Sequence, residues 1–398
     1  MAKRILFVDD EPMVLSGLQR TLCPMRSEWE MVFAVGGNEA LAAMDRQTFD
    51  IIVTDMRMPG MDGVQLLEEV QRRSPQTLRM VLSGQSDRET ILRSVNPAHQ
   101  FISKPCEVEE LKSRLIRAFA LKDLLQNPVL RELVTKLDKL PSLPHIYLQL
   151  NQELSRPEPA LHRIDELIGA DMAMTAKILK LVNSAFFCLP CEISLASHAV
   201  KLLGLDTLKA LVLSAHVFEQ FESNLLTAKD VQDISDHSLA VSHTARKIAG
   251  LERADRRAQD ESFTAGMLHD TGKLILAATM GEEYRKVLEY SWKADVGLHA
   301  AERELLGCSH GQIAAYLFGV WGLPGTIVEA VAWHHEPAES LSSKFSPLAA
   351  VHAASAYHDE KCTSRLRDRT RIDSTYLARI GCAERDKQWR STLDADRQ

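Results

Sequence analysis

Five short apolar segments, separated by amphipathic stretches, organise residues 1–121. Between the segments, apolar residues recur at three- and four-residue spacing, as they do on the buried face of a helix. The segments themselves are rich in β-branched and aromatic residues and have the pattern of buried strands: Arg4–Val8, Met31–Val35, Ile51–Thr54, Met80–Leu82 and Phe101–Ile102. This alternation of strand and helix predicts an α/β domain with a five-stranded, doubly wound parallel sheet.

The pattern changes after residue 121. An amphipathic helix runs on into a linker, residues 122–128, until Asn127 and Pro128 interrupt it. From residue 129 to residue 358 the strand signals vanish and helix follows helix, so we expect an all-α domain there. Residues 359–398 form a charged tail. Its arginines alternate at positions 365, 367, 369 and 371, which we interpret as a solvated loop before a last helix.

Composition narrows the class of protein. A chain of 398 residues is too long for one ordinary core, and 45% hydrophobic with 25% charged residues is typical of soluble multidomain proteins. The net charge of −7 argues against a DNA-binding surface, and no apolar run has the about 18 residues of a membrane span. The early acidic residues Asp9, Asp10 and Glu11 exclude a signal peptide. Seven cysteines without framework spacing favour a reduced, cytoplasmic setting.

Chemically useful side chains follow the predicted strands of the first domain. Asp9 and Asp10 end the first strand, Asp55 ends the third, and Ser83 and Lys104 end the fourth and fifth. The carboxyl ends of parallel strands meet at one edge of a sheet, so these groups should converge. Converging carboxylates repel unless a cation lies among them, and hard carboxylate oxygens favour Mg²⁺. The alternative, acids that merely cap helices, does not explain the lysine and the hydroxyl.

This set of residues resembles the receiver domain of two-component response regulators, and the match covers residues 1–121. The resemblance implies a flavodoxin-like fold in which Asp9, Asp10 and Asp55 hold Mg²⁺ and a sensor histidine kinase phosphorylates Asp55. It also implies that Ser83 and Phe101 are the switch hydroxyl and the switch aromatic residue, that Lys104 contacts the phosphoryl group, and that the chain forms a homodimer.

Two helical stretches of the second domain carry polar groups beside their apolar stripes. On the helix predicted from about 229 to 249, His237 borders the stripe and Asp233 lies one turn before it. In the next helical stretch, Asp270 falls on the apolar face and should point into the core. A lone buried carboxylate is too costly to leave unpaired. We therefore expect a metal or a cationic partner such as Lys273 beside Asp270.

Motifs spread over residues 130–355 are similar to those of HDOD domains, which are related to the HD-type and HD-GYP phosphohydrolases. The motifs are Leu140–Pro144, Ile168–Asp171, Thr175–Ala185, Leu203–Gly204, Phe263–Lys273, Glu302, Gly307, His310–Gly311, Trp321–Pro324 and His334–Pro337. The resemblance implies a site for iron, manganese or zinc, with Lys273 as a phosphate contact. Its ligands would come from His237, His269, Asp270, His310, His334 and His335, with Asp233 as a looser match.

The second domain departs from the enzymes of this group in two ways. Ser355 stands where the enzymes have a late aspartate, with His352 nearby, and the Asp-Gly-x-Gly-Tyr-Pro loop after His335 is absent. HDOD domains often keep parts of the His-Asp set as a buried polar network without catalysis. The sequence therefore favours a response regulator that signals by binding downstream signalling proteins. A metal-dependent phosphohydrolase acting on a nucleotide or a cyclic dinucleotide is the alternative.

Two weaker signals point to structure rather than function. Cys188 and Cys191 form a lone CxxC without a second pair to complete a zinc site. The stretch from His198 to Leu213 has the outline of a helix-turn-helix, but Lys201 and Lys209 are its only basic residues. We expect the cysteine pair to be structural and the chain not to bind DNA.

Overall fold

The computed structural model describes residues 3–83, 97–104, 108–124, 140–142, 144–154, 156, 159–183, 193–203, 218–220, 225–360, 364 and 366–395. The chain divides into two compact units. The first contains residues 1–138 and the second most of residues 139–398, while residues 180–192 and 319–322 group with the first. Within the described ranges, every helix is either too short or too polar to cross a bilayer. The Cys188–Cys191 pair and residues 204–213 lie outside the described residues.

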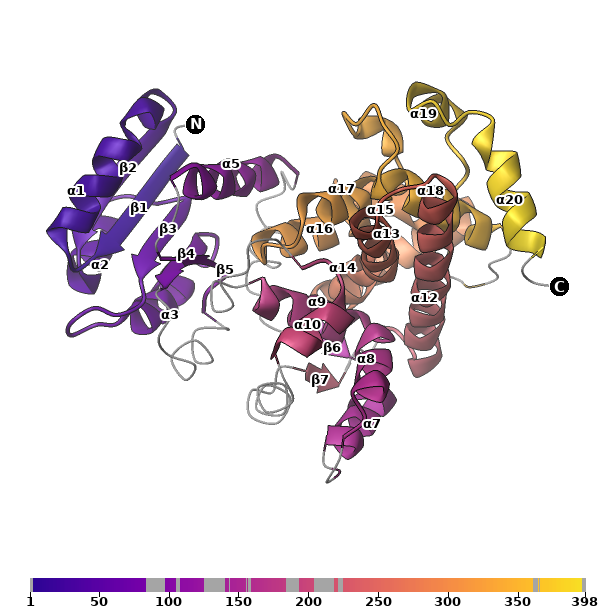
Figure 1. Cartoon of the computed structure of the whole chain (residues 1–398), viewed down its shortest axis with the longest axis horizontal. Coiled ribbons are helices and arrows are strands. Elements are labelled where there is room, and N and C mark those ends of the chain that lie inside the picture. The colour runs from indigo at the N-terminus through magenta and orange to yellow at the C-terminus, as the bar shows by residue number, and fades with distance from the viewer. Residues whose placement is uncertain are drawn as a thin grey trace. The chain divides into compact units, whose positions relative to one another are not determined.

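The first unit contains the predicted five-stranded parallel sheet, in the order β2-β1-β3-β4-β5 (Figure 1). This is the strand order of flavodoxin-like folds, and the prediction of a doubly wound sheet is confirmed. The elements are β1 (Lys3–Asp9), α1 (Pro12–Thr21), η1 (Cys23–Ser27), β2 (Trp29–Val35), α2 (Gly37–Met44), β3 (Ile51–Asp55), α3 (Gly63–Arg73), β4 (Leu78–Ser83), β5 (Gln100–Ser103) and α5 (Val108–Leu124).

Both faces of this sheet are buried, which explains why its strands are continuous apolar runs rather than alternating ones. Leu6 and Val8 of β1 and Ile52 of β3 share one core cluster with apolar residues of α2 and α3. On β1 the intervening residue Phe7 is also fully buried, and its ring stacks on Phe33 at 5.2 Å. Open parallel sheets bind ligands outside the carboxyl ends of their strands, so we look for a functional site at that edge.

The second unit is mostly helical, as expected from its sequence. Its helices are α7 (Pro144–Leu154), α8 (Leu161–Gly169), α9 (Met172–Val182), α10 (Ala196–Leu203), α12 (Ala228–Leu251), α13 (Arg256–Leu268), α14 (Thr271–Ala294), α15 (Leu298–Leu306), α16 (His310–Val320), α17 (Gly325–Trp333), η3 (Pro337–Glu339), α18 (Pro347–Asp359), α19 (Ser374–Arg379) and α20 (Arg385–Ala395). The prediction missed one detail, a two-stranded parallel sheet of β6 (Leu140–Ser142) and β7 (Phe218–Gln220). Strands of three residues are too short to leave a periodic signal.

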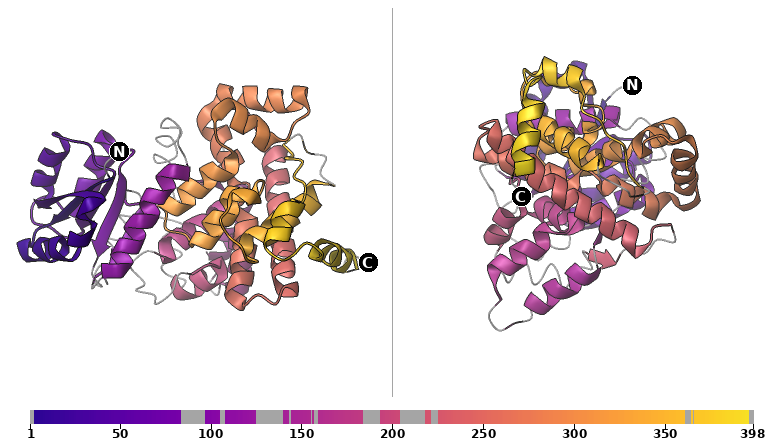
Figure 2. Two further views of the ribbon diagram at one scale, coloured as in Figure 1. Left: turned by 90° about the horizontal axis from the view of Figure 1, so that it is seen from above. Right: turned by 90° about the vertical axis from the view of Figure 1, so that its right-hand side faces the viewer.

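Helix α12 is the centre of the second unit, and it packs against α13 and α18, which also contact each other (Figures 1 and 2). It begins at Thr227, whose side chain accepts a hydrogen bond from the backbone of Asp230 while the Asp230 carboxylate accepts one in return. This capping box fixes the start of the helix one turn before Asp233. The predicted start, at about residue 229, was therefore nearly correct.

The segment Leu366–Thr370, which we call the strap, contradicts the expected solvated loop. Leu366, Asp368 and Thr370 are all buried, at 5% exposure or less, and they alternate with the partly exposed Arg367 and Arg369. The arginines thus mark the outer face of a packed segment.

Candidate functional sites

The first site lies at the carboxyl edge of the parallel sheet. Asp9 and Asp55 end the neighbouring strands β1 and β3, and Lys104 follows β5 directly. The Lys104 Nζ lies 2.9 Å from Asp9 Oδ2 and also pairs with Asp55 Oδ1. Asp10 follows Asp9 and is half-buried. The structure therefore brings Asp9, Asp55 and Lys104 together, as their places at the strand ends predicted.

The backbone around Asp55 is held closely. Its Oδ2 accepts a hydrogen bond from the Arg57 backbone at 2.7 Å. The start of α3 packs so tightly on β3 that a Cβ at Gly63 would overlap the Asp55 carbonyl oxygen. Asp62 and Gln65 form a capping box that fixes this start. The carboxylate consequently has a defined direction before any ligand binds.

The acidic side chains at this edge suit a divalent cation. Burial by itself would lower the pKa of Lys104, but its hydrogen bonds to Asp55 and Asp9 outweigh that effect and leave the pKa raised. Asp9 is 1% exposed, and its carboxylate and those of Asp10 and Asp55 are hard oxygen donors that fit Mg²⁺. The side chains of Ser83 and Phe101 lie outside the described part of the structure.

The second site is a buried cluster of histidines and aspartates, which we call the His-Asp cluster. His269 and Asp270 lie at the junction of α13 and α14, His310 begins α16, and His334 and His335 follow α17. Two overlapping groups have ligand atoms within 4.8 Å of one another and share Asp270. One contains His237, His269 and Asp270, and the other contains Asp270, His310, His334 and His335.

The histidines of the cluster are oriented through their Nδ1 atoms. Nδ1 of His269 donates to the Gly266 carbonyl at 2.7 Å, and Nδ1 of His334 donates to the Val331 carbonyl at 2.8 Å. Their Nε2 atoms are buried and have no hydrogen-bond partner among the described residues. An imidazole anchored through one nitrogen and unsatisfied at the other is the usual arrangement of a metal ligand. The residues therefore fit a transition metal.

Glu302 orients His310 in the same way. This carboxylate is fully buried, accepts hydrogen bonds from both the backbone and Nδ1 of His310, and accepts a third from the Tyr284 hydroxyl at 2.7 Å. Gly272 permits the approach, because a Cβ there would overlap the backbone carbonyl of His310. Helices α14 and α16 are thus fixed against each other at the cluster.

Burial sets the protonation of the histidines. It lowers the pKa of His269 to about 4 and also lowers the pKa values of His334 and His335, so these rings are neutral at pH 7. For His310, burial acts in the same direction, but the charges of Glu302 and Asp368 outweigh it and raise the pKa to about 10. Metal binding at His310 would therefore release a proton.

Sequence reasoning missed two members of this site, Asp368 and His299. The Asp368 carboxylate lies 2.5 Å from Lys273 Nζ, 3.6 Å from His335 Nε2 and 3.9 Å from His310 Nε2. It forms a third group of candidate ligands with His299 and His335. Ser355 stands at the position expected for the late aspartate, and the strap adds a different buried carboxylate, Asp368, to the cluster. The strict alternation of arginines with other residues from position 365 to 371 was the signal that could have found it.

Lys273 bridges the two aspartates. Its Nζ lies 2.7 Å from Asp270 and 2.5 Å from Asp368, and all three side chains are buried. Burial would lower the pKa of Lys273, yet the two carboxylates reverse the shift and raise it. The cation that we expected beside Asp270 is therefore part of the site.

The remaining predicted residues lie around the cluster. His237 Nε2 is 4.0 Å from Asp270 Oδ2, and Asp233 and His237 line a small cavity together with Asp270 and Lys273. His352 donates through Nδ1 to the His334 carbonyl at 2.7 Å and accepts the Asp373 N–H at Nε2, so it supports the backbone. Ser355 is also buried.

Two family models match the chain. The response regulator receiver domain matches residues 5–116, and the HDOD domain matches residues 140–337. Among curated proteins, the hydrogenase transcriptional regulatory protein HoxA of Cupriavidus necator is 41% identical over 103 residues, 25% of this chain and 21% of that protein. An uncharacterized protein of Treponema pallidum is 27% identical over 202 residues, 50% of this chain. The chain spans 21% and 38% of the length of these two relatives.

Two solved structures are among those that this chain resembles. The MmoQ response regulator of Methylococcus capsulatus is 23% identical with a TM-score of 0.47, covering 62% of this chain and 95% of that one. An HDOD domain protein of Geobacter sulfurreducens is 25% identical with a TM-score of 0.39, covering 72% of this chain and 95% of that one.

Proposed function

The chain is a response regulator that joins an N-terminal receiver domain to a C-terminal HDOD domain, and we propose that it works as a phosphorelay switch. In this proposal a sensor histidine kinase phosphorylates Asp55, and the HDOD domain passes the signal on by binding other signalling proteins. The observation that carries the proposal is the pairing of Lys104 with both Asp9 and Asp55 at adjacent strand ends.

The proposed phosphoryl transfer takes place at this edge of the sheet. A carboxylate oxygen of Asp55 bonds to phosphorus while the bond from phosphorus to the kinase imidazole nitrogen breaks and the imidazole takes a proton. Bound Mg²⁺, held by Asp9, Asp10 and Asp55, would neutralise charge on the transferred group. Lys104, already next to Asp55, can pair with the new phosphoryl oxygens without moving far.

The phosphoryl group makes the site at Asp55 more negative. It carries roughly two negative charges but consumes the single charge of the Asp55 carboxylate, so the site gains about one negative charge and Lys104 must divide its interactions between more oxygens than before. In receiver domains such a change reorients the switch residues, here Ser83 and Phe101 by resemblance. We propose that the response continues through α5 to the HDOD domain and alters the pairing of two copies of the chain.

Labelling with a small phosphodonor tests the proposal. Acetyl phosphate with Mg²⁺ should add one phosphoryl group to the full chain, read by intact-protein mass, and Asp55→Asn should abolish the addition. Asp62→Asn is a matched control, because it changes a nearby acid while asparagine still caps α3. Labelling that survives in Asp55→Asn would refute the assignment of Asp55.

A second candidate function, metal-dependent phosphohydrolysis, is favoured by the carboxylate of Asp368 and by the Nε2 atoms of His269 and His334, which have no hydrogen-bond partner in the part of the chain that the structure describes. His237, His269, Asp270, His310, His334 and His335 would hold the metal, which would be iron, manganese or zinc. Such a metal activates a water molecule for attack on phosphorus. In this candidate function Lys273 would exchange part of its pairing with Asp270 for a phosphate oxygen, and Glu302 keeps His310 directed at the cluster.

Metal content and turnover separate the two candidates. We propose that the wild-type protein, expressed in metal-supplemented medium, carries transition metal and that the double variant His269→Ala, Asp270→Ala carries none. His162→Ala, an exposed histidine of α8, is the control and should retain metal. If the wild type and the double variant carry the same amount of metal, the cluster is a polar network of the core and not a metal site. If the wild type cleaves a cyclic dinucleotide over multiple turnovers and the double variant does not, metal-dependent phosphohydrolysis becomes the favoured function.

A further inference from the structure

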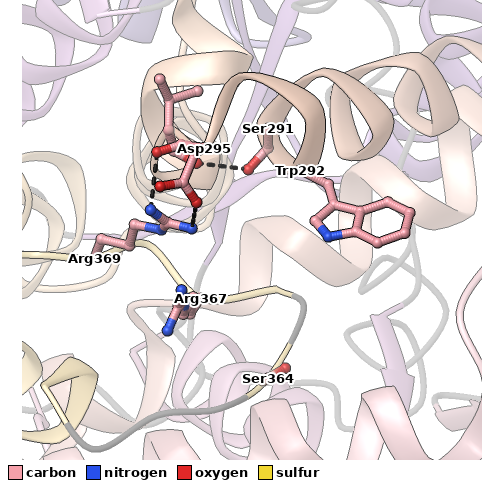
Figure 3. A pocket seen from close by; sticks show the side chains of 7 residues that line it. Ser291, Trp292, Asp295, Ser364, Arg367 and Arg369 are labelled. Atoms are coloured by element: carbon pink, nitrogen blue, oxygen red, sulfur yellow. Dashed lines mark hydrogen bonds and ion pairs between the residues drawn. The ribbon is translucent and has the colours of Figure 1, made fainter.

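A hollow of about 400 Å³ opens beside the last turns of α14, outside the His-Asp cluster. We call it the Trp292 pocket. Figure 3 shows the side chains that give it its chemistry, Trp292 and Asp295 from the end of α14 and Arg367 and Arg369 from the strap. Its volume falls within the range of about 300–1,000 Å³ found for small-molecule sites.

The lining of this pocket suits an anion that carries a planar ring. The Trp292 side chain is 82% exposed, so its ring can stack on a ligand. Arg369 donates to the Asp295 carbonyl at 2.8 Å and pairs with the Asp295 carboxylate. The lining side chains therefore carry two positive charges and one negative charge. Guanidinium groups bind phosphate and carboxylate through paired hydrogen bonds.

The pocket is connected mechanically to the His-Asp cluster through the strap. Arg367 and Arg369 face the pocket, while Asp368 between them reaches Lys273 and His335. Arg369 and Asp295 both adopt left-handed backbone conformations, with φ of 56° and 55°, and they bind each other there. Gly297 completes the contact, since a Cβ at that position would overlap the Asp368 carbonyl oxygen. Arg367 also lines the small cavity beside Asp270 and Lys273.

We propose that the Trp292 pocket binds an anionic ligand with a planar ring, of the size of a nucleoside monophosphate. Its ring stacks on Trp292, its anionic group pairs with Arg367 and Arg369, and its binding holds the strap and therefore Asp368 in place. The proposal requires neither phosphorylation of Asp55 nor metal in the cluster. Its failure would leave both proposed functions standing, and their failure would leave this site standing.

Titration of the full chain with adenosine 5′-monophosphate by calorimetry tests the site. We expect saturable binding that Trp292→Ala weakens by roughly five- to 150-fold, the range measured for loss of one base–aromatic stack. Arg367→Gln should weaken binding by about tenfold or more, through loss of a charged hydrogen bond. Arg163→Gln, an exposed arginine of α8, is the matched control and should change nothing.

Adenosine and inorganic phosphate separate the two halves of the ligand. Each should bind more weakly than the nucleotide, and equal affinity for inorganic phosphate would overturn the role of the ring. Binding should persist after chelator treatment and in Asp55→Asn. Loss of binding with the metal would assign the nucleotide to the His-Asp cluster and refute the pocket. Hydrogen exchange of the strap should slow when the nucleotide is bound, and unchanged exchange in the saturated protein would refute the coupling to Asp368.

Discussion

The substitution Asp368→Asn isolates the charge of the residue that the strap places in the His-Asp cluster. Asparagine keeps nearly the same shape, and its side-chain oxygen can still accept the His299 backbone N–H that Asp368 Oδ1 now accepts at 2.8 Å. What disappears is the negative charge 2.5 Å from Lys273 Nζ. Lys273 is 3% exposed, so its cation would then depend on Asp270 alone.

The expected effect is large because the pair is buried. At 2.5 Å and an effective dielectric constant of about 20, the Coulomb attraction is roughly 7 kcal/mol. Part of this lost attraction is offset, because the variant no longer has to bury the charge of Asp368. Removing one partner of a buried ion pair typically destabilises a protein by about 3–5 kcal/mol. For a unit of this size, that corresponds to a fall in Tm of about 6–20 °C.

Calorimetric unfolding of the full chain in chelator checks this prediction, and the second unit provides the transition to follow. Asp236→Asn, an exposed aspartate of α12 that accepts a hydrogen bond only from Gln232 among the described residues, is the control and should leave that transition in place. If Asp368→Asn moves the transition no further than the control does, Asp368 does not stabilise Lys273. The strap would then be the solvated loop that its arginines suggested.

Two further predictions concern packing and reactivity. Gly272→Ala should destabilise the second unit by about 1–3 kcal/mol, measured by urea unfolding, because its Cβ would overlap the His310 carbonyl. Gly17→Ala, where no atom lies within 4 Å of the added Cβ, should be neutral or stabilising by up to about 1 kcal/mol. Burial raises the pKa of Cys308 to about 12, so a thiol reagent at pH 8 should label exposed Cys23 well before Cys308. Equal labelling rates in site-resolved mass spectrometry would contradict the burial of Cys308.

The places of Asp9, Asp55 and Lys104 in the receiver domain could be predicted from the sequence because local rules determine them. A continuous apolar strand that ends in an acid fixes both the element and the edge at which the acid lies, as for Asp9 and Asp55. The start of α12 was similarly local, since the capping box of Thr227 and Asp230 determines it. Prediction and structure therefore agree best where the position of a residue depends only on one helix or strand and on where that element ends.

The His-Asp cluster could be predicted only in part from the sequence, because contacts between residues far apart in the chain complete it. Asp368 meets Lys273 across 95 residues of sequence, and nothing in the local pattern shows which buried face the strap covers. The alternating arginines predict a solvated loop, although the residues between them, Leu366 and Thr370, are buried. His299 was missed for the same reason, because it joins the site by stacking on His335, with ring centroids 4.3 Å apart.

The central claim is that phosphorylation of Asp55 controls the HDOD domain, and hydrogen exchange of the full chain tests it most directly. Exchange is measured with and without beryllofluoride, a phosphoryl mimic, in the presence of Mg²⁺, for the wild type and for Asp55→Asn. The account predicts protection around β3, altered exchange in α5 and in helices of the HDOD domain, and no change in the variant. Protection around β3 with unchanged exchange throughout the HDOD domain would contradict it.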